Sequence, residues 1–267
     1  MRAVVDEASK LDVPLHRISQ GSGVMMLTDK EISTMVALGE ESDVEVCLFL
    51  GPRGQWDIGA AAVSSSRGAG PRARGTDQLA QCLEEMRRAA DLGVRNVLVA
   101  DEGVLWAGHC LRAVGELPAD FRFKVSVLIG PVNPVGVQVI AGLGGDSINV
   151  PSDLSIAQLS EIRSASPVSL DMYVESPDDM GGFVRLYDVP ELIRVAAPIY
   201  LKFGLRNAPP IYPVGCHLLE TAMATGRERV RRARLALDIV ERLGAQPAPM
   251  SGFEDHSLPR PPRLAFS

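Results

Sequence analysis

The sequence predicts an α/β fold, a (β/α)8 TIM barrel that is irregular at its N-terminus. From residue 44 onward, short apolar stretches typical of buried strands alternate at least six times with longer stretches of helical periodicity. Such alternation indicates a parallel sheet with right-handed crossovers. Several strands also carry polar residues on one face, which favours closure into a barrel. An open doubly wound sheet would instead show near-continuous apolar strands and a glycine fingerprint in its first turn.

The expected organisation has three parts. Residues 1–43 form a lid or a first strand–helix unit, in which Thr28 or Asp29 caps a helix. The barrel follows over 44–244, and 245–267 form a proline-rich tail that we expect to be poorly ordered. The expected barrel strands are 44–50, 96–100, 125–129, 146–150, 168–174 and 199–203, and the expected helices are 76–93, 104–114, 135–143, 154–164, 189–196 and 215–244, the last with a candidate break at Gly226.

Each of these elements rests on a local pattern. The first barrel strand is the run VEVCLFL, and the helix over 76–93 carries apolar residues on one side and ends at Gly93. The next strand, NVLVA, ends in Asp101 and Glu102 before a helix begins. Later units repeat this order, with Ser152 or Asp153 expected to cap the helix over 154–164.

Composition excludes several classes of protein. The 267 residues are 46% hydrophobic and 22% charged, and the net charge of −6 disfavours nucleic acid as a partner. No apolar run is long enough to span a membrane and the N-terminus lacks a signal pattern, so we expect a cytoplasmic protein without a membrane partner. The four cysteines show no CxxC spacing, and GPRGQWD at 51–57 is neither a phosphate-binding loop nor a dinucleotide fingerprint. We therefore expect no iron–sulfur cluster and no nucleotide cofactor.

The candidate site lies at the ends of two strands. In PVSLDMYVESPDD (167–179), alternation places Asp171, Tyr173 and Glu175 on one face. In PIYLKFGLRN (198–207), Lys202 ends a strand in the same way. Because the carboxyl ends of barrel strands meet at one mouth, we expect these side chains to gather there. The further residues expected at or above the mouth are Asp101, Asn149, Arg53, Arg206, Asp178 and His217.

Two mechanisms fit these residues. In the first, Lys202 attacks a carbonyl to form a Schiff base or stabilises negative charge, while Glu175 and Asp101 move protons. Arg53 and Arg206 then hold a carboxylate or phosphate, and the same substrate contacts Asn149 and Tyr173. In the second, a divalent metal (Mg, Mn or Zn) polarises a substrate oxygen. Its candidate ligands are Glu175, Asp101, Glu102 and His217. A third interpretation is a purely structural ion pair between Glu175 and Lys202.

The run from 145 to 207 resembles barrel segments of the collagenase-like peptidase family. The residues that carry the resemblance are GDSINV at 145–150 and YLKFGLR at 200–206, since that family has a similar Lys…Gly-Arg strand end. The resemblance covers about a quarter of the chain and implies a barrel fold, with hydrolase activity as a more distant expectation. The family's histidine- and cysteine-bearing signature is absent here, as is the cysteine set that binds an iron–sulfur cluster in some members.

The sequence therefore predicts an enzyme for a small anionic substrate, with lyase- or isomerase-type chemistry at a carbon next to a carbonyl. Lys202 and Glu175 are the expected central residues. A metal-assisted hydrolase is the alternative, and a non-catalytic barrel that serves in binding or assembly is the third. We expect a homo-oligomer, because many barrels of this kind associate.

Overall fold

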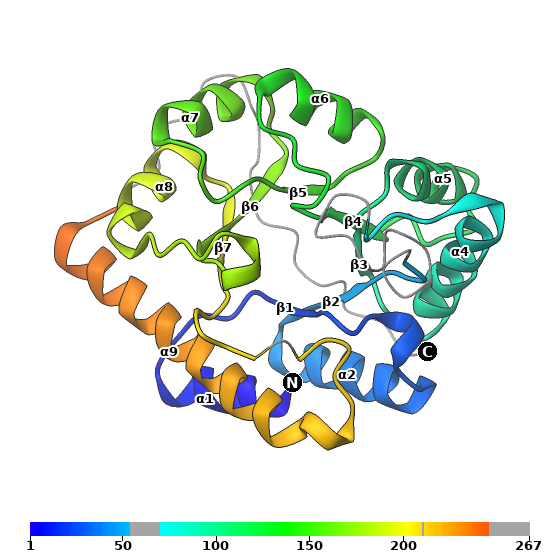
Figure 1. Ribbon diagram of the computed structural model, residues 1–267, viewed down its shortest axis with the longest axis horizontal. Coiled ribbons are helices and arrows are strands. Elements are labelled where there is room, and N and C mark those ends of the chain that lie inside the picture. Colours follow the sequence, from blue (N-terminus) through cyan, green and yellow to red (C-terminus); the bar gives the residue numbers. More distant parts are fainter. Residues whose placement is uncertain (54–69, 210, 246–267) are drawn as a thin grey trace. The chain divides into compact units, whose positions relative to one another are not determined.

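The computed structural model describes residues 1–53, 70–209 and 211–245. The protein has an α/β fold with parallel strands (Figure 1). The chain divides into two compact units. We call the first the C-terminal unit, which contains 1–15, 131–139 and the described residues from 147 to 245. The N-terminal unit contains 16–130, as far as they are described, and 140–146.

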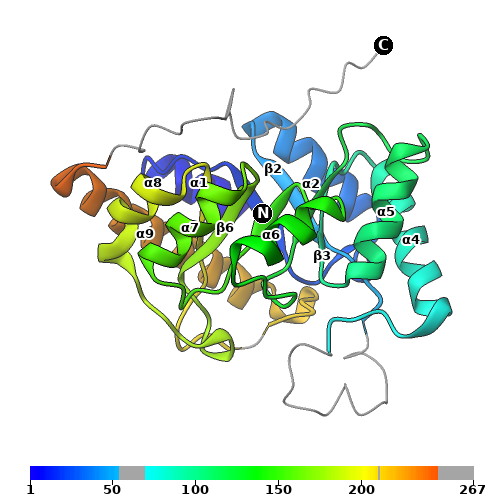
Figure 2. The same ribbon diagram turned by 90° about the horizontal axis from the view of Figure 1, so that it is seen from above.

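The N-terminal unit contains four parallel strands that neighbour one another in sequence order. These strands are β1 (Arg17–Gln20), β2 (Glu45–Phe49), β3 (Asn96–Val99) and β4 (Arg122–Val125). Its helices are η1 (Val24–Met26), α2 (Asp29–Ser42), α4 (Gly75–Asp91) and α5 (Glu102–Ala113). Helices α4 and α5, which come after β2 and β3 in the described part of the chain, pack side by side (Figure 2).

The C-terminal unit contains three parallel strands, β5 (Ser147–Asn149), β6 (Ser169–Glu175) and β7 (Ile199–Phe203), again in sequence order. Its longer helices are α1 (Arg2–Lys10), α7 (Ile156–Ala165), α8 (Val189–Ala196) and α9 (Leu219–Leu243), and its short 3-10 helices are η3 (Asp178–Met180), η4 (Leu186–Asp188) and η5 (Cys216–Leu218). Helix α6 (Pro134–Gly142) contributes residues to both units. Helix α1 lies along α9 (Figure 1), which ties the first residues of the chain to its last described helix.

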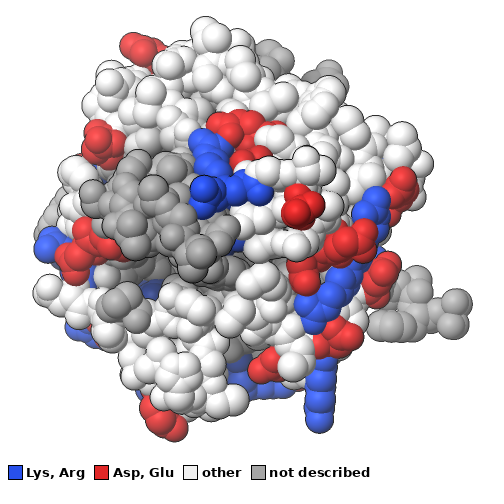
Figure 3. Space-filling model, turned by 45° about the vertical axis from the view of Figure 1, so that its right-hand side comes forward, with Lys and Arg blue, Asp and Glu red and all other residues white. Residues whose placement is uncertain are grey.

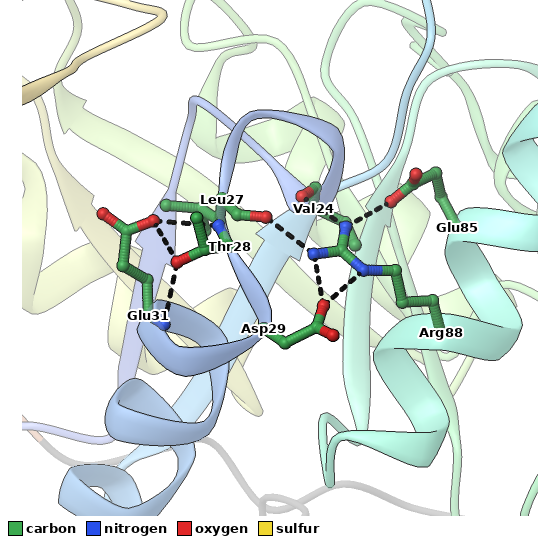
Figure 4. Close-up of polar contacts among 7 residues, drawn as sticks. All are labelled: Val24, Leu27, Thr28, Asp29, Glu31, Glu85 and Arg88. Carbon is green, nitrogen blue, oxygen red and sulfur yellow. Dashed lines mark hydrogen bonds and ion pairs between the residues drawn. The ribbon is translucent and has the colours of Figure 1, made fainter.

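The start of α2 shows how local sequence sets a helix boundary. The Thr28 side chain accepts a hydrogen bond from the backbone N–H of Glu31, and the Glu31 carboxylate accepts one from the backbone N–H of Thr28 (Figure 4). This reciprocal capping box satisfies two backbone donors that the first turn of a helix leaves without partners. The expectation that Thr28 caps this helix is confirmed.

An arginine from α4 fastens the same corner of the N-terminal unit. Arg88 donates to the carbonyl oxygens of Leu27 and Val24, at 2.7 and 3.2 Å, and forms ion pairs with Asp29 and Glu85 (Figure 4). Planar guanidinium groups suit such multiple contacts because their N–H donors form a rigid fork. Arg88 thereby holds the loop before α2 against α4.

A second arginine, Arg163 in α7, organises the C-terminal unit from within. Its side chain is 5% exposed and donates to the carbonyl oxygens of Ser166, Val168, Ala196 and Pro198. Burial lowers the pKa of this guanidinium to about 10, because the charged form is taken out of water. The contacts connect the segments that lead into β6 and β7, so Arg163 fixes where these two strands begin.

The predicted α/β class with parallel strands is confirmed, while three local expectations are wrong. The helix expected over 154–164 is α7, whose cap is Ser155, with its hydroxyl accepting the N–H of Gln158, and not Ser152 or Asp153. The strand expected over 125–129 is β4, which ends at Val125, because Ser126 starts a turn in which its hydroxyl accepts from the N–H of Leu128. Helix α9 is not broken at Gly226. A Cβ added there would lie 2.9 Å from Cγ2 of Val4, so this glycine allows α1 to approach α9 closely.

Other expectations remain predictions. The described residues contain seven strands, and closure into an eight-stranded barrel stays a prediction. The expected tail from 246 onward and residues 54–69 lie outside the described residues. The residues before β2 hold a strand and a helix, β1 and α2, after the additional helix α1.

Candidate functional site

One face of the three strands in the C-terminal unit is polar. Asn149, Asp171 and Tyr200 are in register across β5, β6 and β7, and Tyr173 is in register with Lys202 one row further along. Residues paired in this way on parallel strands point to the same side of the sheet. The opposite face is apolar and comprises Ile148, Leu170, Met172, Ile199 and Leu201. The shared face expected for Asp171 and Tyr173 is confirmed.

Lys202 lies in the middle of this polar face. Its Nζ donates to Oδ1 of Asn149 at 2.8 Å and lies 3.9 Å from the centroid of the Tyr173 ring. Asn149 is 1% exposed, whereas Tyr173 and Lys202 are half-buried. The amine is therefore oriented by a buried amide and by an aromatic face.

Glu175 differs from its expected position because of an irregularity in β6. The register shifts between Tyr173 and Glu175, so that Glu175 pairs with Phe203 and not with the residue that alternation predicts. Two residues of one strand against one of its neighbour are typical of a β-bulge, which turns the following side chain. The expectation that simple alternation continues to Glu175 is wrong for this reason.

The Glu175 carboxylate, 2% exposed as a residue, makes two contacts at the end of β6. One oxygen accepts the backbone N–H of Arg206 at 3.0 Å, and the other lies 3.4 Å from Nε of Arg232 in α9. The backbone carbonyl of Glu175 also accepts the N–H of Gly204 at 2.7 Å. Glu175 thus anchors the turn that follows β7, and its predicted acid–base role stays a prediction.

That turn carries Arg206 to an exposed carboxylate. Nε of Arg206 donates to Oδ1 of Asp178, and its Nη1 donates to the carbonyl oxygen of Gly182 at 2.8 Å. The backbone N–H of Asn207 donates to Oδ2 of the same Asp178 side chain. These hydrogen bonds lower the pKa of Asp178, first through the Asn207 N–H and then through Arg206. Sequence reasoning named both Asp178 and Arg206 but missed their contact, since no spacing pattern signals it.

In the N-terminal unit, Asp101 is the N-cap of α5. Its Oδ1 accepts the backbone N–H of Val104 at 2.9 Å, and its Oδ2 accepts the N–H of Ala73 at 3.3 Å. Neighbouring Glu102 forms an ion pair with Arg72. These contacts give both carboxylates a local structural role, and a catalytic role for Asp101 stays a prediction.

Arg53 is also in the N-terminal unit and is buried, with 6% of its surface exposed. Its guanidinium lies 3.9 Å above the Phe49 ring, and Nη2 donates to the carbonyl oxygen of Gly21 at 3.2 Å. Burial lowers the pKa of Arg53 to about 10. The nearby thiol of Cys82 donates to the carbonyl oxygen of Pro52, and burial raises its pKa to about 12.

The candidate metal ligands do not form a cluster in the described residues. Among the described residues, no three His, Cys, Asp or Glu side chains come together as a set of metal ligands. His217 is exposed in η5, where its ring lies next to Gly215. The metal site over Glu175, Asp101, Glu102 and His217 therefore has no geometric support in the described part of the chain.

Charges on the described surface are mixed. Several arginines form side-chain ion pairs, including those of Arg87 with Glu84 and Glu116. Figure 3 shows lysine and arginine side chains next to aspartate and glutamate on one face. Within the described ranges, no helix is both long and apolar enough to cross a membrane.

Comparison with known proteins adds information at the level of the fold. No family model matches the sequence, and no curated protein matches it. Among solved structures, the chain is similar to the YdjI aldolase from Escherichia coli K12, with a TM-score of 0.50 and 14% identity over 91% of this chain and 86% of that one. At this identity the similarity shows a shared α/β fold and nothing about the reaction.

Two further solved structures are similar to lesser degrees. The U32 peptidase Mk0906 matches at a TM-score of 0.42 and 23% identity over 63% of this chain. The chain spans 65% of the length of that peptidase. U32 peptidases are collagenase-like, so a member of the family that the sequence resembles is among the similar structures. A structure described as native KDPGal matches at a TM-score of 0.43 and 15% identity, over 84% of this chain and 96% of that one.

Proposed function

We propose that the protein is an enzyme of the lyase type that acts on a small carbonyl compound bearing a carboxylate or phosphate. Lys202 is the reactive amine. The observation that carries this proposal is the position of its Nζ, 2.8 Å from Oδ1 of Asn149 and over the ring of Tyr173, on a polar face. An amine held in this way is oriented for attack on a carbonyl carbon.

The proposed step forms a bond between Nζ of Lys202 and the carbonyl carbon. The uncharged amine attacks, and the carbonyl oxygen takes up two protons, one of them from Nζ, and leaves as water, which gives an iminium. The bond from the carbon next to the iminium carbon to the following carbon then breaks. Its electrons form an enamine, and the departing fragment leaves as an aldehyde or ketone after its hydroxyl group loses a proton. Protonation of the enamine and addition of water release the product and restore the Lys202 amine.

Oδ1 of Asn149 accepts a hydrogen bond from Nζ of Lys202. An amide oxygen is too weak a base to remove a proton, so Asn149 orients the amine. Asp171 lies on the same face, in the next row of the register, and is the carboxylate that we assign to proton transfer.

Support for enzyme chemistry also comes from the arrangement of the strands. Polar side chains on a buried sheet face cost free energy unless they are matched, and proteins retain such groups where they serve a site. The YdjI aldolase shares the fold over most of its length, which is consistent with lyase chemistry on this scaffold. Within this proposal Glu175 acts as a positioning residue, because it holds the backbone of Arg206.

Reductive trapping tests the proposal directly. Borohydride is added to the protein with pyruvate and with a panel of other oxo-acids and aldehydes, and the adduct is located by peptide mass mapping. The full sequence contains only four lysines, Lys10, Lys30, Lys124 and Lys202, so assignment is simple. We expect one adduct, on Lys202, and none in Lys202→Arg.

The exposed Lys30 provides the matched control, and Lys30→Arg should keep full trapping. Equal labelling of Lys30 and Lys202 would show ordinary surface reactivity and contradict the proposal. A folded protein that forms no adduct with any carbonyl compound in the panel would instead favour the non-catalytic interpretation.

A further inference from the structure

The turn after β7 contains a receptor for a carboxylate group. Asp178 places one carboxylate oxygen on Nε of Arg206 and the other on the backbone N–H of Asn207. A guanidinium and an amide that hold the two oxygens of one carboxylate form a directional anion site. We call the Nε of Arg206 and the N–H of Asn207 the anion cradle.

The anion cradle is held in shape from below. The N–H groups of Gly204 and Arg206 both donate to Glu175, which is buried and also faces Arg232. Asn207 has a φ of 53°, a left-handed conformation that asparagine tolerates better than most residues. The N–H of Asn207 donates to the same carboxylate that Arg206 contacts. The cradle geometry therefore depends on Glu175 and on the turn, in addition to Asp178.

The occupant of the cradle, in contrast, lies at the surface. The Asp178 side chain is 45% exposed and the Arg206 side chain 46% exposed. Ion pairs in this setting contribute little to stability, because water solvates both groups well when they separate. An anion from solution can replace Asp178 at small cost. The cradle also follows Lys202 by only four residues along the chain.

We infer that the anion cradle receives the carboxylate of the substrate and that Asp178 is an internal competitor, which the substrate displaces. The identity of the ligand as a substrate rests on the function proposed above, whereas the displacement itself does not. Asp178 keeps the cradle occupied and correctly oriented between turnovers. It also raises the ligand concentration needed for binding, since ligand and Asp178 exclude each other.

Nuclear magnetic resonance tests the displacement on the whole protein. The reporters are the amide of Asn207 and the Nε–H of Arg206, titrated at low salt with acetate, pyruvate and inorganic phosphate in separate series. Both signals should shift with one saturable curve. Because exposed pairs are weak, Asp178→Asn and Asp178→Ala should bind acetate and pyruvate more tightly, by a factor of up to about five.

Two variants serve as controls. Arg206→Gln should abolish the saturable shift of the Asn207 amide. Glu191→Gln removes a comparably exposed partner of Arg194 on α8, outside the cradle, and should bind acetate as the unmodified protein does. Saturation with phosphate but not with either carboxylate would overturn the assignment to a carboxylate.

The inference fails if the Asp178 variants and the unmodified protein bind acetate equally, or if the Asn207 amide does not respond in any of them. This result is separable from that of the trapping experiment. Acetate has no reactive carbonyl, so its binding to the cradle should persist in Lys202→Met. Acetate binding without trapping would support the anion cradle and contradict the proposed reaction. Trapping on Lys202 without acetate binding would support the proposed reaction and contradict the anion cradle.

Discussion

Replacing Arg163 in α7 by methionine should lower the stability of the protein substantially. The buried guanidinium of Arg163 satisfies the carbonyl oxygens of Ser166, Val168, Ala196 and Pro198. Methionine has a similar length but no donors. The substitution therefore leaves these oxygens without the contacts that join the starts of β6 and β7.

The magnitude follows from two opposing terms. Each buried carbonyl that loses its donor costs about 1–3 kcal/mol. In the unmodified protein, burial of the charged guanidinium lowers its pKa from 12.5 to about 10, which corresponds to an unfavourable free energy of about 3 kcal/mol. Methionine carries no charge and removes this cost. The carbonyl term is the larger, because the oxygens of Ser166, Val168 and Ala196 each lose the arginine, whereas that of Pro198 keeps the N–H of Leu170. We expect a net loss of about 3 kcal/mol in the free energy of unfolding.

Urea denaturation followed by circular dichroism measures this difference. Arg194→Met on α8 is the control, since Arg194 is exposed and pairs only with its helical neighbour Glu191 among the described residues, and its loss should be within about 0.5 kcal/mol. If Arg163→Met is as stable as this control, the carbonyl contacts do not hold the strands and the reasoning is refuted.

Three further outcomes can be measured. In an NMR titration of carboxylates, the pKa of Asp178 should lie below that of an ordinary aspartate and should return towards the ordinary value in Arg206→Gln. Because the pKa is lowered in the folded state, the stability that Asp178 contributes is present above about pH 4. This stability is lost as the pH falls through the folded-state pKa. An Asp178 pKa that is unchanged in Arg206→Gln would contradict the contact between the two side chains. Asp101→Ala should lower the free energy of unfolding by about 1 kcal/mol through loss of the α5 cap, while Asp101→Asn, which can still cap, should lose much less; equal losses would argue against capping. Iodoacetamide at pH 8 should modify the exposed Cys216 and spare buried Cys82, whose pKa is raised to about 12, and equal rates would show that the burial is wrong.

Much of the fold could be predicted from the sequence, because strand and helix periodicities are local properties. The common face of Asp171 and Tyr173 followed from alternation along a strand that continues without interruption between them. Ser126 shows the limit of this approach. A serine at the end of an apolar stretch fits a strand by pattern, yet here its side chain closes a turn.

The candidate site was predictable only in part. Asp171 and Tyr173 were identified correctly as sharing one face. The register of Glu175 could not be predicted from the sequence. The bulge before it involves pairing with β7 and a bridge to Val184, and both are tertiary contacts. The contact between Asp178 and Arg206 joins residues 28 positions apart across two loops, and no local pattern encodes it.

The most direct test of the central claim compares two lysines within one molecule. Unmodified protein is treated with pyruvate and borohydride, and the initial labelling rates of Lys202 and the exposed Lys30 are read from the same peptide map. The account predicts that Lys202 is labelled at least about tenfold faster, as expected for an oriented amine in a site that binds the ligand. Equal rates, or faster labelling of Lys30, would contradict it.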